Sequence, residues 1–152
     1  MDATKIARVK RDQYRYFVGP DIPPVVEIGS GQEIVVETVD CYSGAITDSA
    51  MRFDSVADLL KRVVGLNPVS GPIAVNGAEP GDVLAVHVLD IQVGTAGGRA
   101  VTMVVPGFGG LCNPNTLAPE IGPDTRICPI RDGVVEFPLR DRVLRLPVRP
   151  MI

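Results

Sequence analysis

Apolar positions along the chain fall in short runs rich in β-branched residues, and glycine or proline separates most of these runs. Such runs, bounded by turn-forming residues, are typical of β-strands. The pattern therefore predicts a mainly β domain, sandwich-like or barrel-like, of short strands with one short helix. After an N-terminal strand within residues 1–17, the predicted strands are Val25–Ile28, Glu33–Asp40, Val69–Val75, Asp82–Val93, Ala100–Val105, Arg126–Ile130, Gly133–Phe137 and Arg142–Val148.

Several of these runs allow more specific predictions. A short glycine-containing segment separates Val25–Ile28 from Glu33–Asp40, which is hairpin spacing. Arg131 and Asp132 likewise predict a hairpin between the two runs that flank them. Asp82–Val93 carries apolar residues on both faces, so we expect a central strand that is covered on both sides.

The predicted helix is Ser55–Val64. Ser55 is a suitable N-cap, Asp58 lies in the first turn, and the apolar residues that follow have helical spacing. Gly65 then ends the helix.

Composition and charge narrow the class of protein. The chain has 152 residues, of which 16 are glycine and 14 are proline, so it can bury a core but is too turn-rich for a helical bundle. We expect residues 1–152 to form a single domain. The net charge of -3, without a clustered basic face, argues against binding to nucleic acid or to a membrane surface. No apolar run is long enough to cross a bilayer and no signal-peptide core is present at the start, which predicts a cytoplasmic location.

Nucleophiles and metal ligands are sparse. Cys41, Cys112 and Cys128 are an odd number without a C-x-x-C pair, which favours reduced thiols, and a single histidine, His87, cannot build a His-rich metal site. Cys41 follows a strand end, where its side chain can project into a cleft. Cys112 and Cys128 are expected to be small apolar filler, and His87 a core or edge residue. From the residues alone, no combination of a nucleophile, a base and an orienting group can be recognised.

Pro106–Leu111 is a glycine-rich loop that opens a long irregular segment reaching Asp124. It lacks the lysine and hydroxyl of a phosphate-binding P-loop. Consecutive glycines instead let the backbone come close to a ligand or to a neighbouring strand.

Residues 66–86 read LNPVSGPIAVNGAEPGDVLAV, and this run resembles the signature of the acetamidase/formamidase family of metal-dependent amide hydrolases. Upstream, Ile22–Val25 followed by Gly31–Asp40 is similar to the family's proline-led strand. Downstream, Pro106–Leu111 and the closing Pro147–Ile152 match further family landmarks. The resemblance spans nearly the whole chain.

In the family, the closing segment continues into a second half with an Asn-Met-Asp segment and a G-D-x-H-x-x-x-G-D-G-E stretch, which is expected to hold the metal ligands. This sequence contains neither. The resemblance therefore implies that this chain is the N-terminal subunit, or processed chain, of an amidohydrolase. On its own it is expected to have no catalytic activity. The complementary C-terminal chain would bind the divalent metal, expected to be zinc with calcium as the alternative. A partner would also cover apolar residues near the end of the chain, namely Leu144, Leu146, Val148 and Ile152.

The resemblance further implies a small amide substrate such as formamide or acetamide, attacked by a metal-activated water, and a higher oligomer. No catalytic residue and no metal ligand can be assigned within this chain. Asp40 and Asn67 are expected to be polar wall residues of the substrate site, and Phe108 and Gly109 a loop against the substrate.

Other interpretations stay open at this point. A lactam or other cyclic amide would suit the same chemistry with a pocket of another size. A β module that binds a partner and has no catalytic role is an alternative from a different class. The two-chain arrangement would arise from two genes or from proteolytic maturation, self-cleavage after Ile152 included, whereas a truncated sequence would mimic it.

Overall fold

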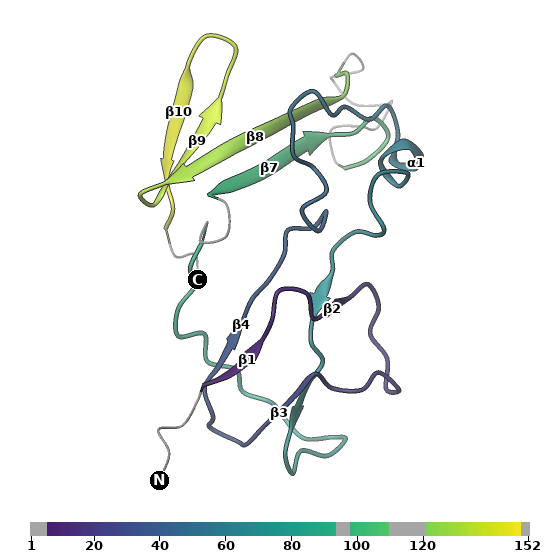
Figure 1. Cartoon of the computed structure of the whole chain (residues 1–152), viewed down its shortest axis with the longest axis vertical. Coiled ribbons are helices and arrows are strands. Elements are labelled where there is room, and N and C mark those ends of the chain that lie inside the picture. Colours follow the sequence, from purple (N-terminus) through teal and green to yellow (C-terminus); the bar gives the residue numbers. More distant parts are fainter. Residues whose placement is uncertain (1–5, 94–97, 110–120, 150–152) are drawn as a thin grey trace. The chain divides into compact units, whose positions relative to one another are not determined.

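The computed structural model (Figure 1) describes residues 6–93, 98–109 and 121–149. In these ranges the chain is mostly strand with one short helix, so the predicted mainly β class is confirmed. The elements are β1 (Ala7–Val9), β2 (Tyr14–Arg15), β3 (Val26–Ile28), β4 (Ile34–Val36), α1 (Val56–Leu59), β5 (Val69–Ser70), β6 (Ile73–Val75), β7 (Arg99–Val104), β8 (Asp124–Arg131), β9 (Val134–Pro138) and β10 (Val143–Pro147).

The chain forms two compact units. The first unit consists of Met1–Gly44 and Gly65–Val86, and the second consists of Ala45–Val64 and His87–Ile152. That residues 1–152 act as a single domain stays a prediction.

Three pairs of very short strands build the first unit. β1 runs parallel to β4, with Ala7 opposite Ile34. β3 runs parallel to β6, with Val26 opposite Ile73, and β2 is antiparallel to β5. Strands that are distant in the sequence therefore pair, while neighbours in the sequence do not.

The predicted hairpin between Val25–Ile28 and Glu33–Asp40 is wrong. The chain does turn there, because the Gln32 N–H donates to the Gly29 carbonyl at 3.2 Å and the Gln32 side chain accepts from the Gly29 N–H at 3.0 Å. β3 and β4 nevertheless pair with β6 and β1. Strand pairing depends on which edges the tertiary structure offers, which loop length alone does not fix.

The predicted strand Val69–Val75 is divided into β5 and β6 at Gly71. The Gly71 N–H donates to the Gln13 carbonyl at 3.0 Å, and Pro72, which has no N–H, accepts from Val25 through its carbonyl at 2.9 Å. The Gly71–Pro72 peptide bond is cis. The two halves consequently serve two different sheets.

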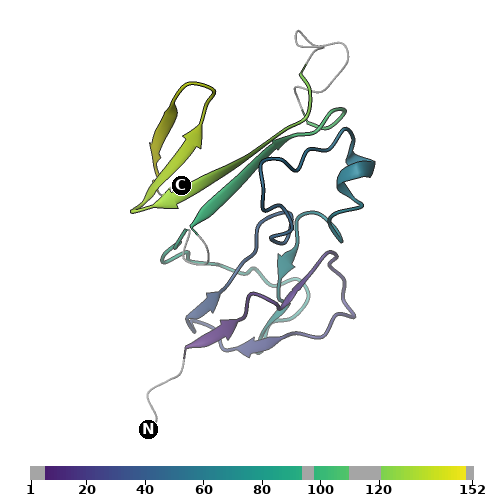
Figure 2. The ribbon, with the colours of Figure 1, turned by 45° about the horizontal axis from the view of Figure 1, so that its top comes forward.

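The second unit contains a four-stranded antiparallel sheet in the order β10-β9-β8-β7. Figure 2 shows β7 running along the long strand β8. The predicted strands and hairpin in this region are confirmed, with the turn one residue later than expected. It falls on Asp132 and Gly133, whose φ angles of 49° and 71° are typical of a tight hairpin turn.

The helix is confirmed at its start and is shorter than predicted. Ser55 caps α1, and its side chain accepts from the Asp58 N–H at 3.1 Å. After Leu59, the N–H groups of Lys61 and Arg62 donate to carbonyls three residues back, at 3.2 Å and 2.9 Å, whereas the Val63 N–H donates to the Leu59 carbonyl four residues back at 3.2 Å. The predicted helix therefore ends before Gly65 in a mixture of 3₁₀-type and α-type turns.

The predicted central strand Asp82–Val93 is also wrong in this structure, where these residues have no strand conformation and are exposed. His87 is accordingly exposed and not a core residue. A strand needs a neighbour with free backbone groups, and the described residues supply none here.

The buried apolar side chains lie mostly in the second unit. Thr125 is buried with them, and its hydroxyl donates to the Met51 carbonyl. In the described ranges no helix is long and apolar enough to span a membrane. The buried apolar residues are Val9 in the first unit and Ile46, Phe53, Leu59, Val63, Val105 and Cys128 in the second.

Candidate functional site

The residues after β4 form a tight turn organised by the Asp40 side chain. Its Oδ1 accepts the backbone N–H groups of Tyr42 at 2.8 Å and Gly44 at 3.1 Å, while the Asp40 carbonyl accepts from Ser43 at 2.9 Å. Ser43 and Gly44 both have left-handed backbone, with φ of 54° and 76°. An aspartate that accepts from the backbone two residues later is the usual way to stabilise such a turn.

Asn67 lies beside this turn. Asp40 and Asn67 are both predicted to line the substrate site, which requires them to be close together. The Asn67 N–H donates to the Cys41 carbonyl at 3.0 Å. Its φ of 55° is left-handed, a conformation that asparagine adopts more readily than most residues. Asp40 and Asn67 are both exposed, so their side chains are accessible from solvent.

Tyr42 and Cys41 add titratable groups to the same turn. Burial, together with hydrogen bonding to Cys41 and the negative charge of Asp40, raises the pKa of Tyr42 to about 12. The phenol therefore stays protonated and can donate a hydrogen bond over the ordinary pH range. Cys41 is exposed and free.

Tyr16 contacts the turn through Ser43. Its hydroxyl shares a hydrogen bond of 2.6 Å with the Ser43 hydroxyl, and its ring meets Tyr14 edge to face at a centroid distance of 5.7 Å. Gly65 allows this ring to lie close, because a Cβ at that position would come within 2.6 Å of the Tyr16 ring. We call Asp40–Gly44 with Asn67 the Asp40 turn.

Phe108 and Gly109, the other two predicted site residues, belong to the second unit. Phe108 is exposed, its N–H donates to the Val105 carbonyl at 3.1 Å, and Gly109 has a left-handed φ of 81°. Their role against a substrate stays a prediction. Cys128 is buried as expected, which raises the pKa of its thiol, and Cys112 lies outside the described residues.

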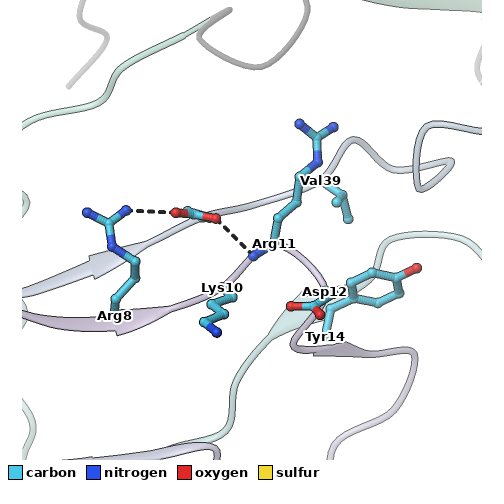
Figure 3. A pocket seen from close by; sticks show the side chains of 7 residues that line it. Arg8, Lys10, Arg11, Asp12, Tyr14 and Val39 are labelled. Atoms are coloured by element: carbon cyan, nitrogen blue, oxygen red, sulfur yellow. Dashed lines mark hydrogen bonds and ion pairs between the residues drawn. The ribbon is translucent and has the colours of Figure 1, made fainter.

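A hollow of about 560 Å³ adjoins β1 and the end of β4 in the first unit (Figure 3). Glu37, one of its lining residues, accepts from Arg8 Nη1 at 2.7 Å and from the Arg11 N–H at 3.1 Å. These contacts lower the pKa of Glu37, chiefly through the Arg8 hydrogen bond. Both carboxylate oxygens are engaged, so this carboxylate is poorly placed to act as a base. The lining residues are Arg8, Lys10, Arg11, Asp12, Tyr14, Glu37 and Val39.

A second hollow of about 450 Å³ lies in the second unit. Arg126 dominates it: the guanidinium contacts Asp124 at 2.8 Å, donates to the Pro138 carbonyl at 2.7 Å and stacks 5.2 Å from the centre of the Phe137 ring. These contacts occupy Arg126 within its own sheet, which indicates a structural role.

The described residues do not fit the divalent metal that the family resemblance implies. In residues 6–93, 98–109 and 121–149, no three His, Cys, Asp or Glu side chains are grouped so that they could hold an ion. A hydrolytic metal needs about three protein ligands. We therefore derive no catalytic step through a metal bound to these residues.

The Asp40 turn offers hydrogen-bonding groups that suit a polar ligand. A carboxylate accepts from an amide N–H, and the Asn67 carboxamide both donates and accepts. The turn has no histidine, the general base most often used, and one oxygen of the Asp40 carboxylate beside Cys41 already accepts two backbone N–H groups.

Two parts of this region escaped sequence reasoning. The contact between Tyr16 and Ser43 joins residues 27 positions apart, and the ion pair between Arg8 and Glu37 joins residues 29 positions apart. No local pattern announces such pairs. The turn itself had a usable signal, since aspartate followed closely by serine and glycine favours a tight turn.

Comparison with known proteins agrees with this fold. The family model described as "Acetamidase/Formamidase family" matches residues 1–118. A formamidase of Methylophilus methylotrophus is 41% identical over 75 residues, which are 47% of this chain and 17% of that protein. An acetamidase of Mycolicibacterium smegmatis is 43% identical over 75 residues, with the same coverage of 47% and 17%.

The solved structures extend the likeness to most of the chain. The crystal structure of an acetamidase from Bacillus halodurans superposes with a TM-score of 0.73 at 30% identity, covering 92% of this chain and 42% of that one. The present sequence thus spans less than half the length of its solved relative.

Proposed function

Because this chain belongs to the acetamidase/formamidase family, we propose that it forms the N-terminal part of an enzyme that hydrolyses the C–N bond of small linear amides such as formamide or acetamide. The observation that carries this proposal is the family match over residues 1–118. The names of two relatives, a formamidase and an acetamidase, support the substrate class.

We place the metal, expected to be zinc, in a part of the enzyme outside this sequence. Two observations support this: the described residues offer no ligand group, and the chain covers 42% of the solved acetamidase. When bound, such an ion would supply Lewis-acid chemistry for hydrolysis. Activity would then require a complementary C-terminal part, in the same polypeptide or in a second chain.

The edge of the second unit's sheet supports a partner. β10 is the last strand of that sheet and all five of its residues are exposed, including Val143, Leu144 and Leu146. An apolar edge strand with unpaired backbone groups favours association. A cytoplasmic higher oligomer remains part of this proposal.

This chain's own contribution is to bind and orient the amide. We assign that role to Asp40 and Asn67, because the hydrogen bond from Asn67 to Cys41 fixes the two residues on one turn. The Asp40 Oδ1 is held by two backbone N–H groups, which orients the carboxylate so that Oδ2 can accept from a substrate amide.

Amide hydrolysis by this chain alone, and by this chain produced together with its complementary part, tests the proposal. We expect ammonia release from formamide or acetamide in the combined sample only. Lactam hydrolysis opens the ring and yields an amino acid without ammonia, so it is measured as loss of the lactam. Hydrolysis of the lactam and of neither linear amide would replace the linear substrate with a cyclic one. A combined sample that contains zinc, forms a stable complex and hydrolyses none of the three amides would overturn the enzymatic proposal in favour of a binding module.

Asn67→Gly separates the side chain of Asn67 from its backbone. Glycine keeps the left-handed conformation at no steric cost and removes the side chain with its carboxamide. We expect a KM for acetamide at least about tenfold higher, the worth of one hydrogen bond to substrate. Val18→Asp, at an exposed position between β2 and β3, is the control. An unchanged KM in Asn67→Gly would remove Asn67 from the binding site.

A further inference from the structure

Residues 83–93 have no regular secondary structure and are exposed. No backbone hydrogen bond joins them to another described residue. Figure 1 draws them as a teal to green coil after β6. Exposed fractions between 49% and 95% are found for Val83, Leu84, Val86, Val88, Leu89, Ile91 and Val93.

A contiguous run of exposed apolar side chains is unusual on the surface of a folded protein. Contiguous exposed apolar surface of this kind marks an interaction site. Backbone N–H and C=O groups that have no partner among the described residues can also pair with another strand. The side chains therefore need cover, and the backbone needs neighbours.

We propose that residues 83–93 become a β-strand when the complementary part of the amidase binds, which supplies neighbouring strands and covers the apolar side chains. The identity of this partner rests on the proposed function. The run itself indicates what this partner must offer: β-strands with unpaired edges, and apolar side chains that face the run.

The order of residues shows how far the cover extends. From Val83 to Val88, both faces are apolar except at His87, a pattern typical of a strand buried between two layers. From Leu89 onward, the face carrying Asp90 and Gln92 is polar, and these two side chains bond to each other at 3.0 Å. We infer cover on both faces in the first half of the run and on one face in the second half.

A second copy of this chain fits less well than the complementary part. An identical strand would occupy one edge of the run and leave the other edge and one face open. Less than half of the solved acetamidase is accounted for by this chain, so ample polypeptide remains to fill both edges. We therefore commit to the complementary part.

Amide hydrogen exchange provides the test. The chain is measured alone and together with the acetamidase-family polypeptide from the same source that corresponds to the part of the solved relatives it does not cover. We expect amides of residues 83–93 to exchange freely in the chain alone and at least about 100-fold more slowly in the complex.

Two matched variants locate the cover. Val86→Asp places a charge on the doubly apolar half and should weaken the complex at least about 100-fold, since a buried unpaired charge is costly. Gln92→Asp places the same charge on the polar face and should leave binding within about threefold. Circular dichroism of each free variant verifies that the chain still folds.

The outcomes separate this inference from the proposed function. Protection in a complex that hydrolyses no amide would support the strand pairing and overturn the activity. An active complex in which residues 83–93 exchange freely would overturn the pairing alone. Protection that depends on concentration in the chain alone would indicate that the run pairs with a second copy. An equal loss of binding in Val86→Asp and Gln92→Asp would contradict the inferred difference between the two halves of the run.

Discussion

The two units of this chain are held together by different means. The second unit is organised by continuous antiparallel ladders, of which β7 with β8 spans six residue pairs from Arg99 to Val104. The first unit has ladders of two or three pairs and depends on the Asp40 turn, the Tyr16 contact and the close approach at Gly65. A ladder spreads stability over many backbone bonds, whereas a turn concentrates it in a few side chains. The candidate binding residues Asp40 and Asn67 lie in the unit where side chains decide the geometry.

Cys128→Asp in β8 has the largest expected effect. Cys128 is 3% exposed and lies opposite Ala100 of β7, so the new carboxylate would be buried without a partner. We expect the free energy of unfolding to fall by about 3–5 kcal/mol, measured by urea denaturation. Val88→Asp, at 71% exposure, should change it by less than about 0.5 kcal/mol. Equal losses in the two variants would show that the uncovered run is packed in the free chain.

Gly65→Ala tests the close packing of the first unit. A Cβ at Gly65 would lie within 2.6 Å of the Tyr16 ring, and the Tyr16 hydroxyl is held by Ser43, so the ring cannot swing away freely. We expect a loss of about 1–3 kcal/mol, as for overpacking elsewhere. Gly19→Ala meets no atom within 4 Å and should be close to neutral. If both variants unfold at the same urea concentration, the ring does not pack on Gly65.

Differences between the units also explain where sequence reasoning succeeded. The hairpin of β8 and β9 was predictable because its partners are adjacent in sequence and because Asp132 and Gly133 suit a tight turn. β3 and β4 were expected to pair for the same local reason, but each pairs with a strand far along the chain. The run 82–93 has the composition of a buried strand and lacks a partner within the described residues. Local pattern identifies strand-forming residues, whereas pairing depends on the rest of the fold.

The candidate site was likewise predicted only in part from the sequence. The resemblance selected Asp40 and Asn67 at positions that the structure joins through the Cys41 carbonyl. The turn that the Asp40 carboxylate organises is signalled by the local sequence instead, since an aspartate followed closely by serine and glycine favours a tight turn.

Asp40→Ala probes how far one side chain holds the turn. It removes the acceptor for the N–H groups of Tyr42 and Gly44, which leaves both donors to water. We expect a loss of about 1 kcal/mol, typical of a lost cap, with faster amide exchange confined to residues 40–44. Asp40→Asn retains an acceptor oxygen and should recover most of the stability. Equal behaviour of the two variants would mean that charge, and not hydrogen bonding, holds the turn.

The ion pair between Arg8 and Glu37 should produce the smallest effect, a slight change in stability that depends on pH. The pair is open to solvent, with side-chain exposures of 51% and 41%. The lowered pKa of Glu37 means that its contribution is present above the ordinary value of 4.5 and is lost as the pH falls through the lower, folded value. Glu37→Gln and Arg8→Ala should each shift the urea midpoint slightly near neutral pH and converge with the parent in acid. Because each change breaks the same contact, the double variant should lose less than the sum of the two. A strictly additive double variant would show that the two side chains act independently, and the local order of the first unit would then rest on its turns alone.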